Sequence, residues 1–198
     1  EQCNNVFLAA GYAPRYQGTP LASPAMQSIH EAIQHVLHAN NPAPAIVLDS
    51  QWQVLAANAS TQVLFDLVGL TPDSAQGLNL LVTLLQPGGL GDHLINACEI
   101  RRVAWQRAAR EALDNRELAH LLEQLPAPAM PEVLSDELPP LVMTRVNSQQ
   151  GELNFLSTFT TFGMPQDVTV TSLRIEHLIP ADPHTWHTMR RAYEQASQ

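Results

Sequence analysis

The sequence predicts an α+β domain built around one five-stranded antiparallel sheet. Two short β-rich segments early in the chain and three in its last third are separated by stretches with helical periodicity. Hydrophobic residues make up 45% of the 198 residues and charged residues 15%, a composition typical of a globular domain. A chain of this length buries enough surface to fold without a disulfide or a metal.

The first 22 residues are expected to precede this domain. Residues 4–10 have the pattern of the last turns of a helix, which Gly11 would end. Residues 12–22 contain two prolines and a glycine, which is typical of a linker. We therefore place a boundary between residues 1–22 and a domain over 23–198.

The segment from 23 to 68 predicts a helix, a β-hairpin and a second helix. Ser23 and Pro24 are typical of a helix start, and apolar residues then recur at steps of three and four until Asn40. Two short apolar runs, 45–48 and 52–56, are separated by three polar residues and predict the hairpin. Asn58 is expected to cap the next helix, over about 59–68.

The middle of the chain predicts helices joined by loops. A short helix is expected within the apolar run 78–86, between loops rich in glycine and proline. A longer helix follows over about 92–115, and a further helical segment over 116–125. Five prolines between 126 and 140 then predict an extended connection.

The last third predicts three antiparallel strands, over about 141–146, 152–162 and 167–178, and a closing helix over about 182–196. Along the second strand both faces mix apolar and polar side chains, so the alternation does not identify the buried face. The face on which Phe155 and Phe159 flank Ser157 would either line a ligand cavity or belong to a plain core.

The charge balance disfavours a nucleic-acid-binding surface on this chain. The formal net charge is -9, and all ten basic residues are arginines. Such a chain is a poor electrostatic match for DNA or for anionic lipid. No run of 18 apolar residues predicts a membrane span. We interpret Cys3 and Cys98 as reduced thiols of a cytoplasmic protein.

No motif predicts an enzyme or a metal site. The sequence lacks the nucleophile elbow G-x-S-x-G, the P-loop and the dinucleotide-binding G-x-G-x-x-G. His30 and His35 are five residues apart, so they face different sides of a helix and cannot share a metal as i, i+4 pairs do. We predict no catalytic residue, no metal ligand and no required cofactor.

Arg101 is the most unusual residue of the helix expected over 92–115. It falls between Cys98 and Trp105 on an apolar stripe, where a guanidinium needs a partner. Two interpretations stay open. Its stem would cover apolar surface while its head meets water or a carboxylate of the domain. Alternatively, it would bind the carboxylate of a ligand with an apolar tail.

Two segments resemble a known family, the MmyB-like transcription regulators, which carry an XRE-type helix-turn-helix. PAIVLDSQWQVLAANASTQVLF is similar to the signature of their ligand-binding domain, with Asp49, Trp52 and Asn58 at the family's spacing. GELNFLSTFTTFGMPQDVTVTSLRIEHLIPAD resembles the terminal strands of the same domain. The opening segment FLAAGYAPRY resembles the end of the helix-turn-helix domain that precedes it.

The resemblance implies the PAS-like ligand-binding domain of a bacterial one-component regulator. The family domain is associated with fatty-acid binding, so the resemblance implies a fatty acid or a similar apolar carboxylate as ligand. It also implies a homodimer without membrane contact. DNA would be bound only through an N-terminal domain that is absent from this chain.

We expect the ligand between the sheet and the helices over 59–68 and 92–115, with Arg101 receiving the carboxylate. The residues expected around the tail are Phe65, Leu84, Trp105, Phe155 and Phe159. Asn58 is included in the site, although we expect it to act mainly as a helix cap. The alternatives are a dimerisation module whose pocket is filled by its own side chains, and an enzyme on a PAS-like frame. The lack of a paired base and nucleophile disfavours the enzyme.

Overall fold

The computed structural model describes residues 19, 23–70, 77–128, 141–163 and 167–197. The elements in chain order are the 3-10 helix η1 (Pro24–Met26), α2 (Gln27–Ala39), β1 (Ala45–Leu48), β2 (Val54–Ala57), α3 (Ala59–Val68), α4 (Leu80–Leu85), the 3-10 helix η2 (Leu90–His93), α5 (Ala97–Glu111), α6 (Arg116–Gln124), β3 (Met143–Ser148), β4 (Gly151–Thr160), α7 (Val168–Ser172), β5 (Arg174–Pro180) and α8 (Pro183–Ala196).

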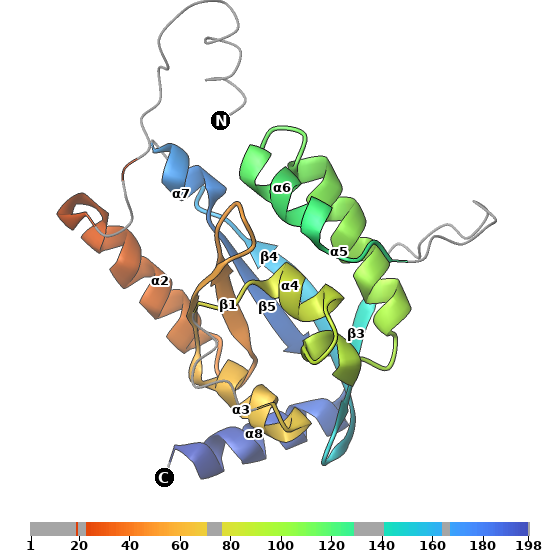
Figure 1. The fold of residues 1–198 in the computed structure, drawn as a ribbon. Helices are drawn as coiled ribbons and strands as arrows, with labels where there is room; N and C mark the ends of the chain where they lie inside the picture. Colours follow the sequence, from red (N-terminus) through yellow and green to blue (C-terminus); the bar gives the residue numbers. More distant parts are fainter. Residues whose placement is uncertain (1–18, 20–22, 71–76, 129–140, 164–166, 198) are drawn as a thin grey trace, which may run out of the picture.

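All five strands belong to one antiparallel sheet, in the order β2-β1-β5-β4-β3. β1 pairs with β5, so the early hairpin and the late strands meet in the middle of the sheet (Figure 1). The predicted α+β class with a five-stranded antiparallel sheet is therefore confirmed.

Helices cover the two faces of the sheet unequally. α3, α4, α5 and α6 pack against one face, which we call the inner face, and enclose the larger core around Leu64, Leu81 and Phe155. α2 packs on the opposite face through Ile33 and Leu37, against the smaller core formed mainly by β1 and β5, with residues of β2 at its margin (Figure 1). The candidate site lies on the inner face.

Packing decides which face of β4 is buried. Leu153 and Phe155 are fully buried, whereas Phe159, on the same face nearer the end of the strand, is 42% exposed. Because Phe159 lies opposite Glu176 of β5, the two side chains share the inner face. The Phe155 face is thus the inner one, a choice that the mixed alternation left open.

The helix predicted over 92–115 is shorter than expected. η2 takes its first residues, and α5 begins only at Ala97. Between them Leu94 forms an antiparallel bridge with Val146 of β3. This bridge extends the pairing beyond β3, whose edge would otherwise present unpaired N–H and C=O groups.

The apolar stripe predicted on this helix is also wrong in part. Cys98 is exposed, whereas Ala104 and Ala108 are buried against the core. Trp105 is only partly buried beside them. The core-facing side of α5 is therefore rotated away from the predicted line, and Arg101 lies at its flank.

The strand predicted over 167–178 contains a helix. Asp167 accepts a hydrogen bond from the backbone N–H of Thr169 (2.8 Å) and starts α7, and β5 follows at Arg174. The β-branched residues of this segment favour strands, but burial of Val170 and the cap stabilise one helical turn instead.

Two of the three predicted helix caps form in the structure. Asn58 caps α3 and Asp182 caps α8, as predicted. Asn58 also accepts from the N–H of Ala45 (3.0 Å) and donates to the carbonyl of Ala43 (2.8 Å), so it fastens α3 to the start of β1. Ser23 makes no side-chain cap, although Pro24 does begin η1.

Some predictions lie outside the described residues. These are the helix end over 4–10 and most of the extended connection over 126–140, so the boundary after residue 22 stays a prediction. In the described part of the chain, no helix combines the length and apolar character needed to cross a membrane.

Candidate functional site

Two adjoining cavities lie between the inner face of the sheet and the helices α4 and α5. The inner cavity, which α3 also borders, has a volume of about 90 Å³, and the outer cavity, beside Trp52 and Phe159, about 310 Å³. Five residues line both cavities, and we call them the waist: Leu80, Leu84, Ile100, Thr144 and Glu176. The two cavities therefore adjoin, and the waist is the wall that they share.

The inner cavity is almost wholly apolar. Its walls outside the waist are Pro44, Ala45, Ile46, Thr61, Leu64, Phe65, Leu90, Leu94 and Leu178. The Thr61 hydroxyl has its hydrogen-bond acceptor within the protein, since it donates to the carbonyl of Ala45 or to Asn58, each at 3.0 Å. Such walls suit a hydrocarbon group rather than a polar one.

The outer cavity combines aromatic and charged side chains. Arg107 reaches into its wall from α5, and its guanidinium lies 3.9 Å from the centre of the Phe159 ring. Trp52 and Ser157 line the same cavity. A cation stacked on an aromatic ring keeps N–H groups at its edge free for a further partner.

Arg107 belongs to a group of four side chains that we call the Trp52 cluster: the buried Trp52 and Arg174 and the partly buried Arg107 and Glu111. Glu111 accepts hydrogen bonds from Trp52 Nε1 (2.8 Å), Arg107 Nε (2.9 Å) and Arg174 Nη1 (3.1 Å). Arg174 lies over the Trp52 ring, with its central carbon 4.6 Å from the ring centre. One carboxylate thus connects α5, β5 and the β1–β2 turn.

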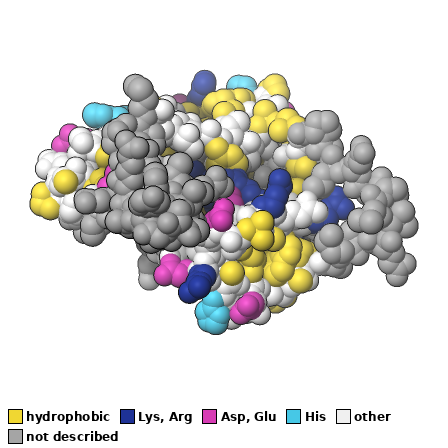
Figure 2. Space-filling model, turned by 90° about the horizontal axis from the view of Figure 1, so that it is seen from above, with side chains coloured by type: hydrophobic (Ala, Val, Ile, Leu, Met, Phe, Trp, Pro, Cys, Tyr) yellow, Lys and Arg dark blue, Asp and Glu magenta, His cyan; other side chains and the backbone are white. Residues whose placement is uncertain are grey.

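The cluster has two guanidinium groups for a single carboxylate. Burial alone would raise the pKa of Glu111, but Arg174, Arg107 and the Trp52 indole outweigh it and hold that pKa below its ordinary value. Glu111 is therefore ionised, and two guanidinium groups face this one carboxylate within the cluster, while Glu176, outside the cluster, also attracts both arginines. Figure 2 shows basic side chains at the centre of one face of the molecule, next to acidic and hydrophobic ones.

Trp52 has an unusual backbone conformation. Its φ is 64°, in the left-handed region that a bulky residue adopts only at a cost of about 1–2 kcal/mol. Asp49 Oδ1 shapes this turn by accepting from the N–H groups of Gln51 (2.8 Å) and Gln53 (2.9 Å). The strained turn delivers the indole to Glu111 and Arg174, so it serves the cluster.

Glu176 is the charged member of the waist. Ser157 donates its hydroxyl hydrogen to Glu176 Oε1 (2.6 Å). Burial raises the pKa of Glu176, although Ser157, Arg107 and Arg174 act in the opposite direction. The carboxyl of Glu176 is therefore easier to keep neutral than that of an exposed glutamate.

The structure brings some of the predicted site residues together. Leu84 lines both cavities, Phe65 the inner one and Phe159 the outer one. Phe155 lies fully buried in the core, and Trp105 packs against that core; neither lines either cavity. Asn58 is buried as the cap of α3 and does not line them either.

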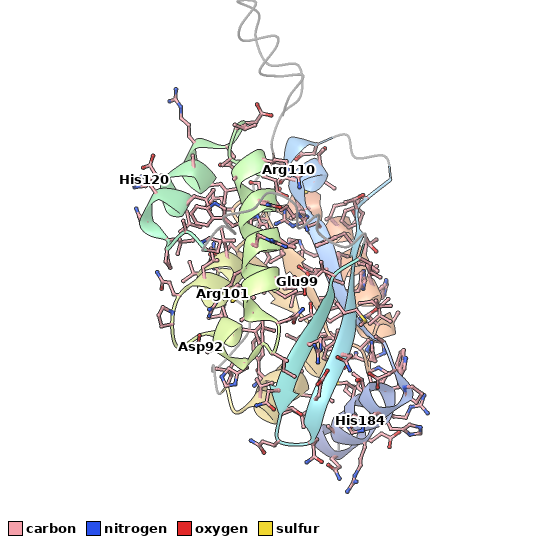
Figure 3. The ribbon with its side chains drawn as sticks, turned by 90° about the vertical axis from the view of Figure 1, so that its right-hand side faces the viewer. Asp92, Glu99, Arg101, Arg110, His120 and His184 are labelled. Carbon is pink, nitrogen blue, oxygen red and sulfur yellow. The ribbon has the colours of Figure 1, made fainter. Side chains whose placement is uncertain are left out.

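Arg101 is directed to another part of the domain. Its Nε donates to the carbonyl of Leu84 (2.8 Å), and its Nη2 pairs with Asp92 at 2.7 Å (Figure 3). Arg101 lines neither cavity and instead ties α5 to α4 and η2. This is the first of its two interpretations, a pair with a carboxylate of the domain; contact with a ligand stays a prediction.

The sequence reasoning missed the charged residues of the site. Arg107 and Glu111 are four apart on α5, which places them on one helix face, and Arg174 and Glu176 alternate along β5, which places them on one side of the strand. These spacings are visible in the sequence, but only the packing shows that one residue of each pair, Arg107 and Glu176, lines the outer cavity. In the described ranges, no three His, Cys, Asp or Glu side chains are grouped to hold a metal.

Comparisons with known proteins identify the family. A family model described as "MmyB-like transcription regulator ligand binding domain" matches residues 29–192. No curated protein sequence matches the chain. Similar solved structures include the PAS domain of Bordetella pertussis BvgS, which is 14% identical and covers 87% of this chain and 100% of its own, with a TM-score of 0.39.

An RNA-binding light-oxygen-voltage receptor is also similar, at 16% identity, covering 98% of this chain and 47% of its own, with a TM-score of 0.35. Both TM-scores are low, so the assignment depends on the family model. That model spans most of the sequence, and it agrees with the resemblance carried by residues 44–65 and 151–182. The chain belongs to the family of MmyB-like transcription regulator ligand-binding domains.

Proposed function

We propose that this domain senses a fatty acid or a closely similar apolar carboxylate. The observation that carries the proposal is that an apolar cavity adjoins a cavity with Arg107 in its wall and Arg174 behind that wall. The ligand would alter DNA binding by a domain outside this chain, in a cytoplasmic homodimer. It can do so only by binding two states of the dimer with different affinity.

The apolar tail would occupy the inner cavity and the waist. Their walls come from four elements, α3, α4, α5 and the sheet, so an alkyl chain would be surrounded rather than laid in a surface groove. Each methylene that leaves water contributes about 0.8 kcal/mol. Affinity should therefore rise with chain length until the inner cavity is full.

The carboxylate would bind Arg107 in the outer cavity. Arginine binds carboxylates through two parallel hydrogen bonds. The Nε of Arg107 already donates to Glu111. A second carboxylate would balance the two guanidinium groups of the Trp52 cluster. Arg101, in contrast, already has Asp92 as its partner. We therefore place the anchor at Arg107 rather than at Arg101.

The size of the outer cavity supports a ligand over the alternative of a pocket filled by its own side chains. Its volume of about 310 Å³ falls at the lower end of the range for small-molecule sites, roughly 300–1,000 Å³. The family also supports regulation rather than catalysis. A pure dimerisation module would have no need for unfilled space beside buried charges.

The proposal is tested by native mass spectrometry of the purified chain, organic extraction, and calorimetric titration with saturated C8 to C18 acids. Arg107→Gln should weaken binding of the best acid about 10- to 100-fold, because a charge-assisted hydrogen-bond pair is lost. It should leave binding of the alcohol of the same length unchanged. Arg101→Gln is the matched control and should bind the acid like the parent.

Two outcomes contradict the proposal at different levels. If Arg107→Gln and Arg101→Gln both bind like the parent, the carboxylate is not held at Arg107. If the parent has a clean apo mass and none of the acids binds, the domain does not sense this class of ligand.

A further inference from the structure

We propose that the ligand has a second polar group, a hydroxyl or keto oxygen on its chain, and that Glu176 and Ser157 bind it at the waist. This inference rests on the proposed function and narrows it, because it separates substituted acyl chains from plain saturated ones. It concerns a different part of the cavity from the carboxylate anchor.

Glu176 lines both cavities. It projects from the inner face of β5, where its strand neighbours in register are Ile46 of β1 and Phe159 of β4. The other members of the waist are three aliphatic residues and Thr144. A ligand chain that extends from the outer to the inner cavity would therefore run beside the Glu176 carboxyl.

The architecture of the domain does not account for Glu176. Among the described residues its side chain makes one hydrogen bond, from Ser157 to Oε1, and Oε2 has none. No arginine lies within ion-pair distance of Glu176 in that part of the chain; the ion pairs of Arg107 and Arg174 are both with Glu111. A carboxyl in an apolar wall is costly without a partner, so its second oxygen is suited to a ligand.

The chemistry of the pair selects the partner. A neutral carboxyl both donates and accepts a hydrogen bond, and the Ser157 hydroxyl, whose hydrogen goes to Glu176 Oε1, can still accept one. Burial raises the pKa of Glu176, which makes the neutral, donating form more accessible. A hydroxyl or keto group on the ligand chain matches these donors and acceptors. A methylene would displace water from Oε2 without forming a hydrogen bond to replace it.

The experiment compares matched acids that differ by one oxygen. The probes are decanoic and dodecanoic acid and their monohydroxy derivatives with the hydroxyl at each carbon from the third to the last. The parent should bind one hydroxyl position about 10- to 100-fold more tightly than the unsubstituted acid of equal length. The position identifies which carbon lies at the waist.

Variants assign the preference to the pair. Glu176→Leu should abolish the preference and bind the unsubstituted acid more tightly than the parent does. Glu176→Gln keeps a donor and an acceptor and should keep most of the preference, and Ser157→Ala should reduce it. Glu152→Gln, an exposed change near the opposite end of β4, is the control and should behave like the parent.

Each outcome decides between the proposals. If the parent binds plain and hydroxylated acids equally, this inference is overturned and the proposed function stands. A preference for the hydroxylated acid that persists in both Glu176→Leu and Ser157→Ala also overturns it, because another group must then bind the hydroxyl oxygen of the ligand. If no acid of either kind binds, the proposed function and this inference fail together. Should Glu176→Leu not fold, Ser157→Ala and Glu176→Gln provide the same decision.

Discussion

Replacing Glu111 with glutamine is expected to lower the stability of the domain and to tighten carboxylate binding. Glu111 accepts hydrogen bonds from Trp52, Arg107 and Arg174. Glutamine keeps the shape of the side chain but removes its charge. Arg174, whose side chain is only 10% exposed, is then left without its counter-ion.

The structure allows the size of the loss to be worked out. Removing one partner of a fully buried ion pair costs about 3–5 kcal/mol. The side chain of Glu111 is 31% exposed, so solvent screening reduces this, and we expect about 2 kcal/mol. For a domain of this size such a loss lowers Tm by about 4–8 °C.

The assay is thermal unfolding of the parent, Glu111→Gln and Glu123→Gln, followed by calorimetric titration with the best saturated acid. Glu123 is 76% exposed at the end of α6 and serves as the control. In Glu111→Gln the ligand carboxylate no longer competes for Arg107, so Kd should fall while Tm falls. The reasoning is refuted if Tm matches that of Glu123→Gln, or if stability and affinity decrease together.

Three further predictions concern backbone fit, capping and pH. Gly91→Ala should lower the free energy of unfolding by about 1–3 kcal/mol or more, because its Cβ would lie 2.1 Å from the carbonyl oxygen of Leu84. Gly163→Ala, whose Cβ meets open space, is the control and should unfold in urea like the parent. Asn58→Ala should lose more than the ~1 kcal/mol of a simple cap, and Asn58→Asp should recover only the accepting half of its bonds; equal urea midpoints for the two would contradict this. Glu176 has a raised folded-state pKa, so the stability of the parent is fully present below the ordinary glutamate pKa and is lost as pH rises through the raised one. Glu176→Gln should therefore gain Tm relative to the parent as pH rises above the ordinary glutamate pKa, and parallel Tm curves of the two proteins would rule this out.

The sequence predicted correctly those helix starts that depend on contacts between neighbouring residues. Asn58 and Asp182 start helices because their side chains bond the N–H groups of the first turn, an interaction that needs only three residues. Ser23 has the same chemistry but makes no such bond. A cap is thus a local preference, which holds where packing allows it.

Long-range contacts explain the predictions that were wrong. Leu94 fits a helical pattern, but it bridges to Val146, about fifty residues later, and so begins no helix. Segment 167–178 has strand-forming residues, yet the Asp167 cap converts part of it into α7. In both cases local propensity is weaker than the contacts made in the folded domain.

The same division applies to the site. Leu84 and Phe65 were predicted because apolar periodicity identifies the side chains that leave water, whereas Phe159 was predicted from a strand whose buried face the alternation left open. Arg107 and Glu176 were missed because a charged residue has no pattern that tells whether it faces solvent or a cavity. The structure gives Arg101 a partner in Asp92, nine residues earlier, and that pairing is set by the turn through Gly91.

By itself the sequence determined the α+β class and the five strands, which follow from composition, period and capping chemistry acting over a few neighbouring residues. It also indicated the family, through the resemblance of two segments to a known ligand-binding domain. Only the tertiary structure decided which face of β4 is buried, which arginine reaches the cavity and where Glu176 stands. Those outcomes depend on contacts between side chains of α5, β4 and β5, which lie far apart in the sequence, so no local pattern of residues predicts them.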